Sequence, residues 1–285
     1  MQQSGAECEF CSSDSWVILS PIEQSIKRKI EAVGTPLKDW DIQINYGIKT
    51  GYNDAFIIDT AKRDEILANC QSENERERTA ELIRPILRGR DIKRYGYNWA
   101  NLWLINTHNG IRGKLERIHI EDYPTVKAHL DQYWDRISKR ADKGDTPYNL
   151  RNCAYLEDFS KPKIVFQEIV QESQFFYDMD GRFICNDTCR IIVGKELSFL
   201  LGVLNSKLFF YAIKHFYGGG VLGEHGIRMK HTFFQNFPCI QYNSTIDKLV
   251  KELTEKKNAK VENQIGNKIY NLYGLTPQEI QMVEE

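Results

Sequence analysis

The spacing of apolar residues along the chain predicts a mixture of amphipathic helices and short strands. A helix is expected after the capping box at 20–23, because Ile22, Ile26 and Ile30 then fall on one face. Residues 40–48 alternate apolar and polar side chains, which is the period of a strand. Further strands are expected at 55–59, 102–105, 163–170, 175–177, 183–184 and 190–193.

Other segments have the period of helices. They are 72–83, 124–137, 197–216 and the region after Pro238, with apolar stripes at 246–253 and 265–272 and a final helix capped at 276–279. Residues 139–161 are charged and rich in turn residues, which indicates a loop. Asp180 and Gly181 are typical of a tight turn, so the strands on either side of them are expected to form a hairpin.

The order of these elements predicts an α+β fold. We expect a mixed, twisted and bent β-sheet with flanking helices and a helical C-terminal tail. Three regions are expected, namely an N-terminal leader and linker helix at 1–37, a main domain at 38–241 and the tail at 242–285. The loop near 140–162 is a candidate boundary inside the main domain.

The composition is that of a folded protein. The chain has 285 residues, 41% of them hydrophobic, and its 38 Lys and Arg against 39 Asp and Glu give a net charge of -1. No apolar run is long enough to cross a membrane, and the first residues lack the pattern of a signal peptide. We therefore expect a cytoplasmic protein with no membrane partner, whose seven cysteines are reduced.

The glycine-rich stretch at 218–226 does not predict a cofactor site. Its spacing fits dinucleotide and methyltransferase loops, but those loops follow a strand, whereas 208–216 has the pattern of a helix. Cys8 and Cys11 are half of a zinc site, and the other cysteine pair, at 185 and 189, has a different spacing. We expect no cofactor and no metal ion in this chain, with zinc at Cys8 and Cys11 as the alternative.

Basic side chains mixed with aromatic ones are the main sign of a function. Residues 84–94 contain five Lys or Arg against one Asp, and aromatic residues follow at 95, 97 and 99. Residues 112–117 contain three Lys or Arg against one Glu, and 207–230 contain four against one Glu. Loops of this kind suit contacts to phosphates and to base edges, and a solvated charged surface is the alternative.

Seven short motifs follow one another in an order that is hard to obtain by chance. They are NYGIKTGYN at 45–53, AFIID at 55–59, IRPILRGRDI at 83–92, KPKIVF at 161–166, LNSK at 204–207, YGGG at 217–220 and LYGLT at 272–276. This succession resembles the TaqI-like C-terminal specificity domain of type II, chiefly type IIG, restriction–modification enzymes, whose catalytic part is an adenine-specific DNA methyltransferase. The resemblance covers about residues 20–285.

The resemblance implies sequence-specific recognition of duplex DNA, with 38–241 as the target-recognition domain. The expected partners are duplex DNA and a methyltransferase domain of the same parent polypeptide, and a dimer through the C-terminal helices is a further expectation. S-adenosylmethionine, and magnesium if the parent also cuts DNA, are expected only in missing domains of the parent. The chain alone is therefore expected to be no enzyme and to hold no catalytic residue.

Two other functions stay open. The first is a self-contained metal-dependent nuclease, for which Glu255-Lys256-Lys257 supplies a Glu-x-Lys motif in a segment that has the pattern of a solvated helix. The second is a protein-interaction module that uses the apolar stripes of the helical tail.

The residues expected to contact DNA lie in the signature loops and the basic segments. Either Arg88 or Arg90 is expected to contact a phosphate, with an ion pair to Asp91 as the alternative. The whole set is Lys49, Thr50, Tyr52, Asn53, Arg84, Arg88, Arg90, Lys93, Arg94, Arg112, Lys114, Gly219, Gly220, His225, Arg228 and Lys230.

Overall fold

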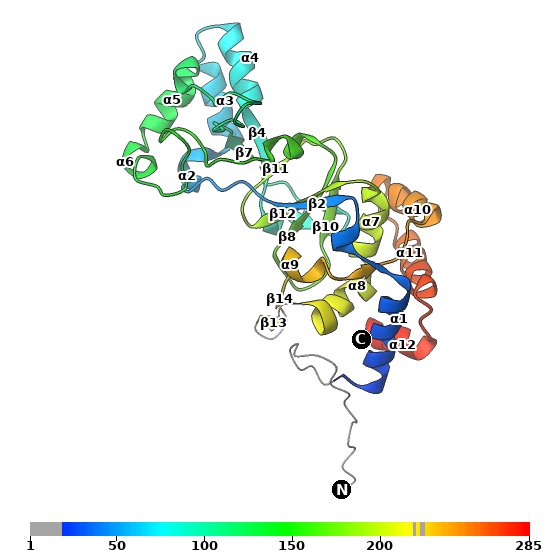
Figure 1. Cartoon of the computed structure of the whole chain (residues 1–285). Coiled ribbons are helices and arrows are strands. Elements are labelled where there is room, and N and C mark those ends of the chain that lie inside the picture. The colour runs from blue at the N-terminus through cyan, green and yellow to red at the C-terminus, as the bar shows by residue number, and fades with distance from the viewer. Residues whose placement is uncertain (1–18, 219–220, 223–225) are drawn as a thin grey trace. The chain divides into compact units, whose positions relative to one another are not determined.

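The residues of the chain form two compact units. We call residues 41–201 the central unit, and the described residues before 41 and after 201 the terminal unit. The computed structural model describes residues 19–218, 221–222 and 226–285 (Figure 1). The division into compact units does not test the boundaries of the functional regions that we expect after residues 37 and 241, so these boundaries stay predictions.

Helices make up most of the terminal unit. α1 (Pro21–Val33) begins at the expected capping box, because the Ser20 hydroxyl accepts from the Glu23 N–H while the Glu23 carboxylate accepts from the Ser20 N–H. The other helical segments are α8 (Lys207–Ala212), a π-helical turn (Ile213–Tyr217), α9 (His231–Phe234), α10 (Ser244–Glu255), α11 (Ala259–Leu272) and α12 (Pro277–Glu284). The short strands are β1 (Thr35–Pro36) with β15 (Pro238–Cys239) and β13 (Val221–Leu222) with β14 (Gly226–Arg228), each an antiparallel pair.

The apolar stripes of the C-terminal helices are buried along most of their length. Their buried members are Ile246, Val250, Leu253, Ile265 and Ile269. The stripe of α11 departs from the expected pattern at its end, where Leu272 is 39% exposed and Tyr273 is buried instead. The Tyr273 hydroxyl donates a hydrogen bond to the Pro238 carbonyl at 2.7 Å, which satisfies this polar group inside the core.

Two four-stranded sheets form the centre of the central unit. In the first sheet all neighbours are antiparallel, and the strand order is β10 (Phe175–Asp178), β8 (Lys163–Gln167), β12 (Cys189–Gly194) and β2 (Ile42–Tyr46). In the second sheet the order is β11 (Ile184–Cys185), β4 (Ile83–Leu87), β7 (Leu102–Ile105) and β3 (Ile57–Asp59). β11 pairs with β4 in parallel, and the remaining pairs are antiparallel.

The hairpin expected around Asp180 and Gly181 is wrong. β10 pairs with β8, while β11 pairs with β4 of the other sheet. The physical reason lies in the Asp178 carboxylate, which accepts hydrogen bonds from the N–H groups of Arg182 and Phe183. These bonds close the turn onto a side chain and direct the second strand away from the first.

Short helices cover the rest of the central unit. They are α2 (Asn53–Phe56), α3 (Thr60–Ala68), α4 (Glu73–Leu82), α5 (Pro124–Asp131) and α6 (Trp134–Ile137), with short strands β5 (Ile92–Lys93), β6 (Gly96–Tyr97) and β9 (Ile169–Val170). α3 packs against α4, α5 and β7 (Figure 1). The strand expected at 55–59 is half helix, since α2 occupies its first residues, and the helix expected at 124–137 is interrupted between α5 and α6.

A buried ion pair joins the neighbouring strands β8 and β10 of the first sheet. The Lys163 ammonium and the Asp178 carboxylate are 2.6 Å apart, and their side chains are 0% and 4% exposed. Lys163 also donates to the Phe159 carbonyl, so both charged groups are hydrogen-bonded. Burial lowers the pKa of Lys163, and the Asp178 charge opposes that effect.

The α+β fold class expected from the sequence is confirmed. The helix expected at 197–216 is divided into α7 (Leu197–Leu204), α8 and the π-helical turn, because Ser206 caps a new helix by accepting from the Phe209 N–H. Among the described residues no single helix is long and apolar enough to cross a membrane. By length and composition the segments 197–204 and 207–217 meet that test only as a pair bent by 63°.

Candidate nucleic-acid interface

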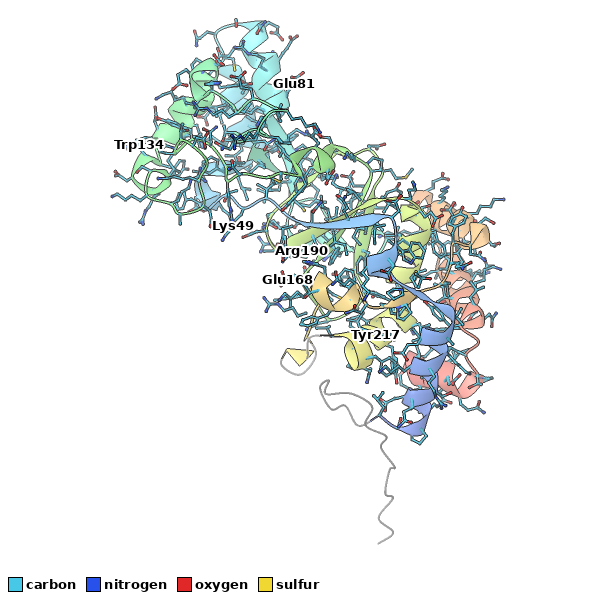
Figure 2. The ribbon with its side chains drawn as sticks, viewed as in Figure 1. Lys49, Glu81, Trp134, Glu168, Arg190 and Tyr217 are labelled. Atoms are coloured by element: carbon cyan, nitrogen blue, oxygen red, sulfur yellow. The ribbon has the colours of Figure 1, made fainter. Side chains whose placement is uncertain are left out.

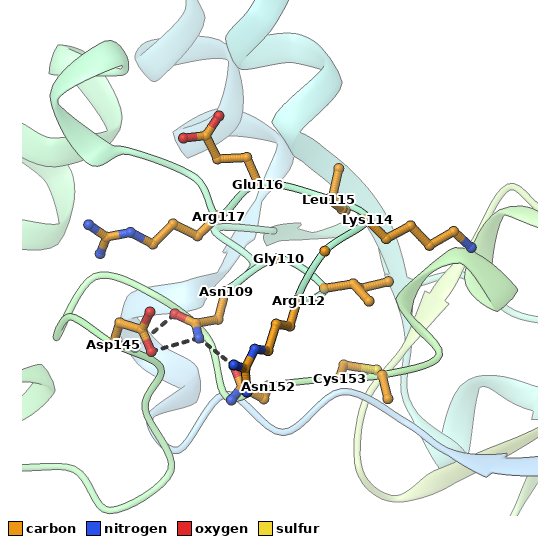
Figure 3. Close-up of a pocket in the computed structure, with 13 residues that line it drawn as sticks. Asn109, Gly110, Arg112, Lys114, Leu115, Glu116, Arg117, Asp145, Asn152 and Cys153 are labelled. Carbon is orange, nitrogen blue, oxygen red and sulfur yellow. Dashed lines mark hydrogen bonds between the residues drawn. The ribbon is translucent and has the colours of Figure 1, made fainter.

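The basic loop at 109–117 borders a hollow in the central unit (Figure 3). This hollow, which we call the loop hollow, has a volume of about 810 Å³ and is lined by residues 109–117, Asp145 and residues 152–154. Arg112 and Lys114 are exposed on the loop. Figure 3 shows the Arg112 side chain extending toward Asn152, whereas Lys114 and Arg117 extend away on opposite sides.

The shape of this loop depends on two glycines. The Lys114 N–H donates to the Ile111 carbonyl at 2.9 Å, and Gly113 in the third position of that turn has a φ of 74°. Gly110 has a φ of 72°, and a Cβ on it would lie 2.4 Å from the Leu115 carbonyl oxygen. Both positions therefore require glycine, and the turn holds Arg112 at its tip.

A set of hydrogen bonds organises the floor of the loop hollow. The Asn109 side-chain oxygen accepts from the Asp145 backbone N–H at 2.7 Å. The Asn109 side-chain nitrogen donates to Asp145 Oδ1 at 3.0 Å and to Oδ1 of Asn152. Asn109 is thus fully bonded and fixes the two polar side chains beside it (Figure 3).

A second hollow adjoins the first. It has a volume of about 340 Å³, is lined by residues 46–49, residues 151–153, Tyr155 and Asp187, and shares Asn152 and Cys153 with the loop hollow. We call it the strand-end hollow, because it lies where β2 ends.

The two basic residues of the strand-end hollow share one carboxylate. Lys49 and Arg151 lie 2.8 and 3.1 Å from the Asp142 oxygens. The hydrogen bond from Lys49 lowers the pKa of Asp142, so this carboxylate stays charged at neutral pH and offsets one of the two positive charges.

An aromatic ring also lies at the strand-end hollow. Tyr46 is 45% exposed, and the Arg190 guanidinium lies 4.0 Å from its ring centroid. Glu168 forms an ion pair with Arg190, which keeps the guanidinium in place (Figure 2). This arrangement presents a rigid ring to solvent.

Arg140 connects the loops that carry these groups. Its guanidinium donates to the backbone carbonyls of Thr50, Asp142, Pro147 and Asn149, and it lies 4.3 Å from the Phe56 ring centroid. Burial lowers the pKa of Arg140 to about 10, so it remains charged at neutral pH. Arg140 therefore holds the loop before α2 against the loop at 142–149.

The first signature loop is placed partly below the surface. Thr50 is 2% exposed and donates its hydroxyl hydrogen bond to Asn53. Tyr52 is half-buried with its ring centroid 6.1 Å from that of Tyr133, while Asn53 is exposed at the start of α2. Lys49 and Asn53 are thus the members of this loop with the most accessible side chains.

The basic segment at 84–94 mixes bonded and exposed cations. Arg88 donates two hydrogen bonds to the Asp91 carboxylate. The ion pair with Asp91, which was the alternative to a phosphate contact, is therefore formed by Arg88. Arg90 is exposed, and no ion pair or side-chain hydrogen bond joins it to another described residue. Arg90 is therefore the arginine of this pair that is accessible to a phosphate.

The remaining basic side chains of this segment contact other groups of the protein. Arg84 donates to the Ser160 hydroxyl and to the Gly181 carbonyl. Lys93 donates to the Arg90 carbonyl at 2.9 Å, and the Arg94 guanidinium lies 5.6 Å from the ring centroid of the adjacent tyrosine.

The other expected site residues belong to the terminal unit. Arg228 and Lys230 are exposed there, and the Lys230 ammonium lies 5.7 Å from the Phe233 ring centroid. Gly219, Gly220 and His225 lie outside the described residues. The structure therefore brings together Lys49, Arg112 and Lys114 around the two hollows and places Arg228 and Lys230 on a separate unit.

The described residues contain no group of three His, Cys, Asp or Glu side chains placed to hold a metal ion. Cys8 and Cys11, the alternative zinc ligands, lie outside those residues. Cys185 and Cys189 are buried, and burial raises the pKa of Cys189 well above its usual range, which opposes thiolate formation.

Residues 84–221 match the TaqI-like C-terminal specificity domain family. The resemblance found in the sequence is confirmed for this part of the chain. The match contains the whole lining of the loop hollow, and the signature loop at 49–53 lies before it.

One curated relative and two solved structures extend this match. The type II methyltransferase M.BanIII of Aneurinibacillus aneurinilyticus is 25% identical over 198 residues, which cover 62% of this chain and 33% of that protein. The type IIL restriction–modification enzyme MmeI, solved in complex with DNA, has a TM-score of 0.61 at 14% identity and covers 87% of this chain and 35% of its own. The type IIG restriction endonuclease BpuSI has a TM-score of 0.59 at 15% identity, over 92% of this chain and 31% of its own. The chain thus spans about a third of the length of each of these proteins.

Proposed function

We propose that the chain recognises a short sequence in duplex DNA as the specificity domain of a restriction–modification enzyme. The observation that carries the proposal is the position of the loop hollow. Its lining residues all lie within the 84–221 segment that matches the specificity-domain family, and they include an exposed arginine at the tip of a rigid turn.

Local charge supports this proposal although the net charge is -1. Arg90, Arg112 and Arg117 have no ion pair or side-chain hydrogen bond to another described residue, so their charges are available to an anionic partner. Lys49 and Lys114 are paired with Asp142 and Glu157. DNA binding then depends on a few arginines of the central unit, with the paired lysines contributing less net attraction.

The activity of the parent protein is part of the same proposal. A methyltransferase domain in the same polypeptide would bind S-adenosylmethionine and transfer its methyl group to adenine, with magnesium only if the parent also cuts DNA. For this chain alone we expect no binding of S-adenosylmethionine, because the segment before the glycine-rich stretch is helical from 207 to 217. None of the matches above favours a self-contained nuclease or a protein-interaction module.

Binding to pooled duplex DNA at a series of salt concentrations tests the proposal. The double variant Arg90→Ala/Arg117→Ala should bind more weakly and flatten the plot of log affinity against log salt by about 0.9 for each phosphate that is no longer neutralised. Arg76→Ala is the matched control, since Arg76 is an exposed arginine on the glutamate-rich helix α4. If the parent chain, the double variant and the control all show the same salt dependence, these arginines do not contact the DNA phosphates.

A further inference from the structure

We propose that the loop hollow reads a single G·C base pair from the major groove, with Arg112 on the guanine and Asp145 on the cytosine. This inference rests on the proposed function and names the residues that determine specificity. It follows from the hydrogen-bonding groups that the hollow presents, which differ from those of a phosphate site.

The lining of the loop hollow contains both donors and acceptors. Arg112 offers the donors of its guanidinium, while Asp145 offers a carboxylate oxygen, Oδ2, that accepts no bond from another described residue. A phosphate presents only acceptors and is repelled by a carboxylate. A base pair presents acceptors and donors side by side, so this lining suits a base-pair edge.

Asn109 fixes the orientation of the groups that face the hollow. Its oxygen accepts from the Asp145 N–H, which requires its nitrogen to point toward Asp145 Oδ1 and Asn152 Oδ1. The Asp145 carboxylate is thereby held with Oδ2 unoccupied, and Asn152 is left with its N–H₂ group as a further donor. Asn109 is a positioning residue, because its side-chain oxygen and nitrogen are already hydrogen-bonded within the protein and do not contact a base.

Arg112 is placed to reach a base. It lies at the tip of the turn closed by Ile111 and Lys114, and a Cβ on Gly113 would meet no atom within 4 Å. The major groove, which is about 12 Å wide, admits a two-stranded ribbon, so a tight turn such as this one fits into it. Within the described part of the chain no ion pair joins Arg112 to Asp145, so the guanidinium is not already occupied.

The combination of these two side chains selects a G·C pair. An arginine donates to N7 and O6 of guanine through two parallel bonds, and an aspartate accepts from N4 of cytosine. Lys114 lacks the planar fork and is paired with Glu157, so it does not supply the same readout.

Selection from a randomised duplex pool, followed by sequencing, tests this inference. The parent chain should enrich a short motif that contains a G·C pair. Arg112→Ala and Asp145→Ala should each lose the preference at that same base pair, by roughly tenfold to a hundredfold for the arginine, while the other positions of the motif are retained. Arg112→Lys should recover little of the preference although it keeps the charge. Asn109→Ala should relax the same position and no other.

A second measurement depends on a single atom of the DNA. Replacing the guanine by 7-deazaguanine removes N7, so it should weaken binding of the parent chain and leave binding of Arg112→Ala unchanged. Arg90→Ala is the matched control, and it should lower affinity for all sequences alike with the motif intact.

Three outcomes would overturn the inference. If Arg112→Ala and Asp145→Ala enrich the unchanged motif, the chain recognises DNA but not through the loop hollow. A uniform loss of affinity for all sequences in Arg112→Ala identifies a phosphate contact. A parent chain that binds no duplex DNA refutes the proposed function itself, and the inference with it.

Discussion

Arg88 holds the Asp91 carboxylate through two side-chain hydrogen bonds, from Nε to Oδ2 at 3.0 Å and from Nη2 to Oδ1 at 2.8 Å. The Arg88 backbone N–H donates to the same carboxylate at 2.9 Å. The bond to Asp91 raises the pKa of Arg88, and the Asp91 side chain is only 5% exposed. The neighbouring Arg90 is exposed and has no such partner among the described residues. The two arginines of one short segment therefore have separable roles.

Replacing Arg88 should reduce stability, whereas replacing Arg90 should reduce DNA binding. Arg88→Ala leaves a buried carboxylate without its guanidinium, which costs about 1–3 kcal/mol of unfolding free energy. Arg90→Ala should leave the Tm unchanged and flatten the salt dependence of DNA binding by about 0.9. Thermal melting and salt titration of both variants measure these effects. A lower Tm for Arg90→Ala together with a flatter salt dependence for Arg88→Ala would contradict these roles.

The buried pair of Lys163 and Asp178 should be intolerant of losing one partner. Asp178→Ala leaves an ammonium group unpaired at a site that is 0% exposed, with an expected cost of about 3–5 kcal/mol. Replacing Lys163 by Met together with Asp178 by Leu removes both charges and should cost less than the single change. Urea unfolding of the two variants gives the comparison, and equal losses would show that the unpaired charge is not the cause.

Glu279 should make the terminal unit sensitive to acid. Burial raises the pKa of Glu279, but hydrogen bonds from Lys29, Thr276 and Ser25 outweigh it and lower the pKa to about 2. The folded-state pKa is thus below the unfolded value near 4.5, so the stabilisation is present above pH 4.5 and is lost as the pH falls toward 2. At neutral pH it amounts to about 3 kcal/mol at most.

The variant Glu279→Gln tests this pH dependence. Its Tm should be lower than that of the parent at pH 7, and the difference should shrink as the pH falls below about 4.5. A difference that is constant from pH 7 to pH 3 would mean that the charge of Glu279 is not the source of the effect.

Arg140 should keep two loops of the interface closed. Arg140→Met removes donors to the carbonyls of Thr50, Asp142 and Asn149 while keeping much of the packing volume. Amide hydrogen exchange should become faster at 47–54 and 142–150 and stay unchanged in α10 and α11. Unchanged protection in the two loops would show that Arg140 does not hold them.

Locally encoded features of the fold could be predicted from the sequence. The capping boxes at 20–23 and 276–279 start α1 and α12, because a cap depends on residues three positions apart. The strand partners could not be predicted in the same way. β11 pairs with β4 and not with β10, and the hydrogen bonds to Asp178 that turn the chain between β10 and β11 are visible only in three dimensions.

The same distinction applies to the candidate site. The basic loop with Arg112 and Lys114 was visible in the sequence, because charge and glycine are local properties. Asn109, Asp145 and Asn152 were missed, since Asn109 is 36 and 43 positions from its two partners and no short motif joins them. Arg140 was missed for a related reason, because its partners are backbone carbonyls and these leave no signature in the side chains.

The central claim is that this chain selects a short sequence in duplex DNA, and selection by the parent chain from a fully randomised duplex pool tests it most directly. The account predicts that one short motif is enriched, and that a duplex carrying this motif competes for the chain better than a duplex of scrambled sequence at every salt concentration. Recovery of the pool without any enriched motif, from a folded chain at low salt, would contradict it.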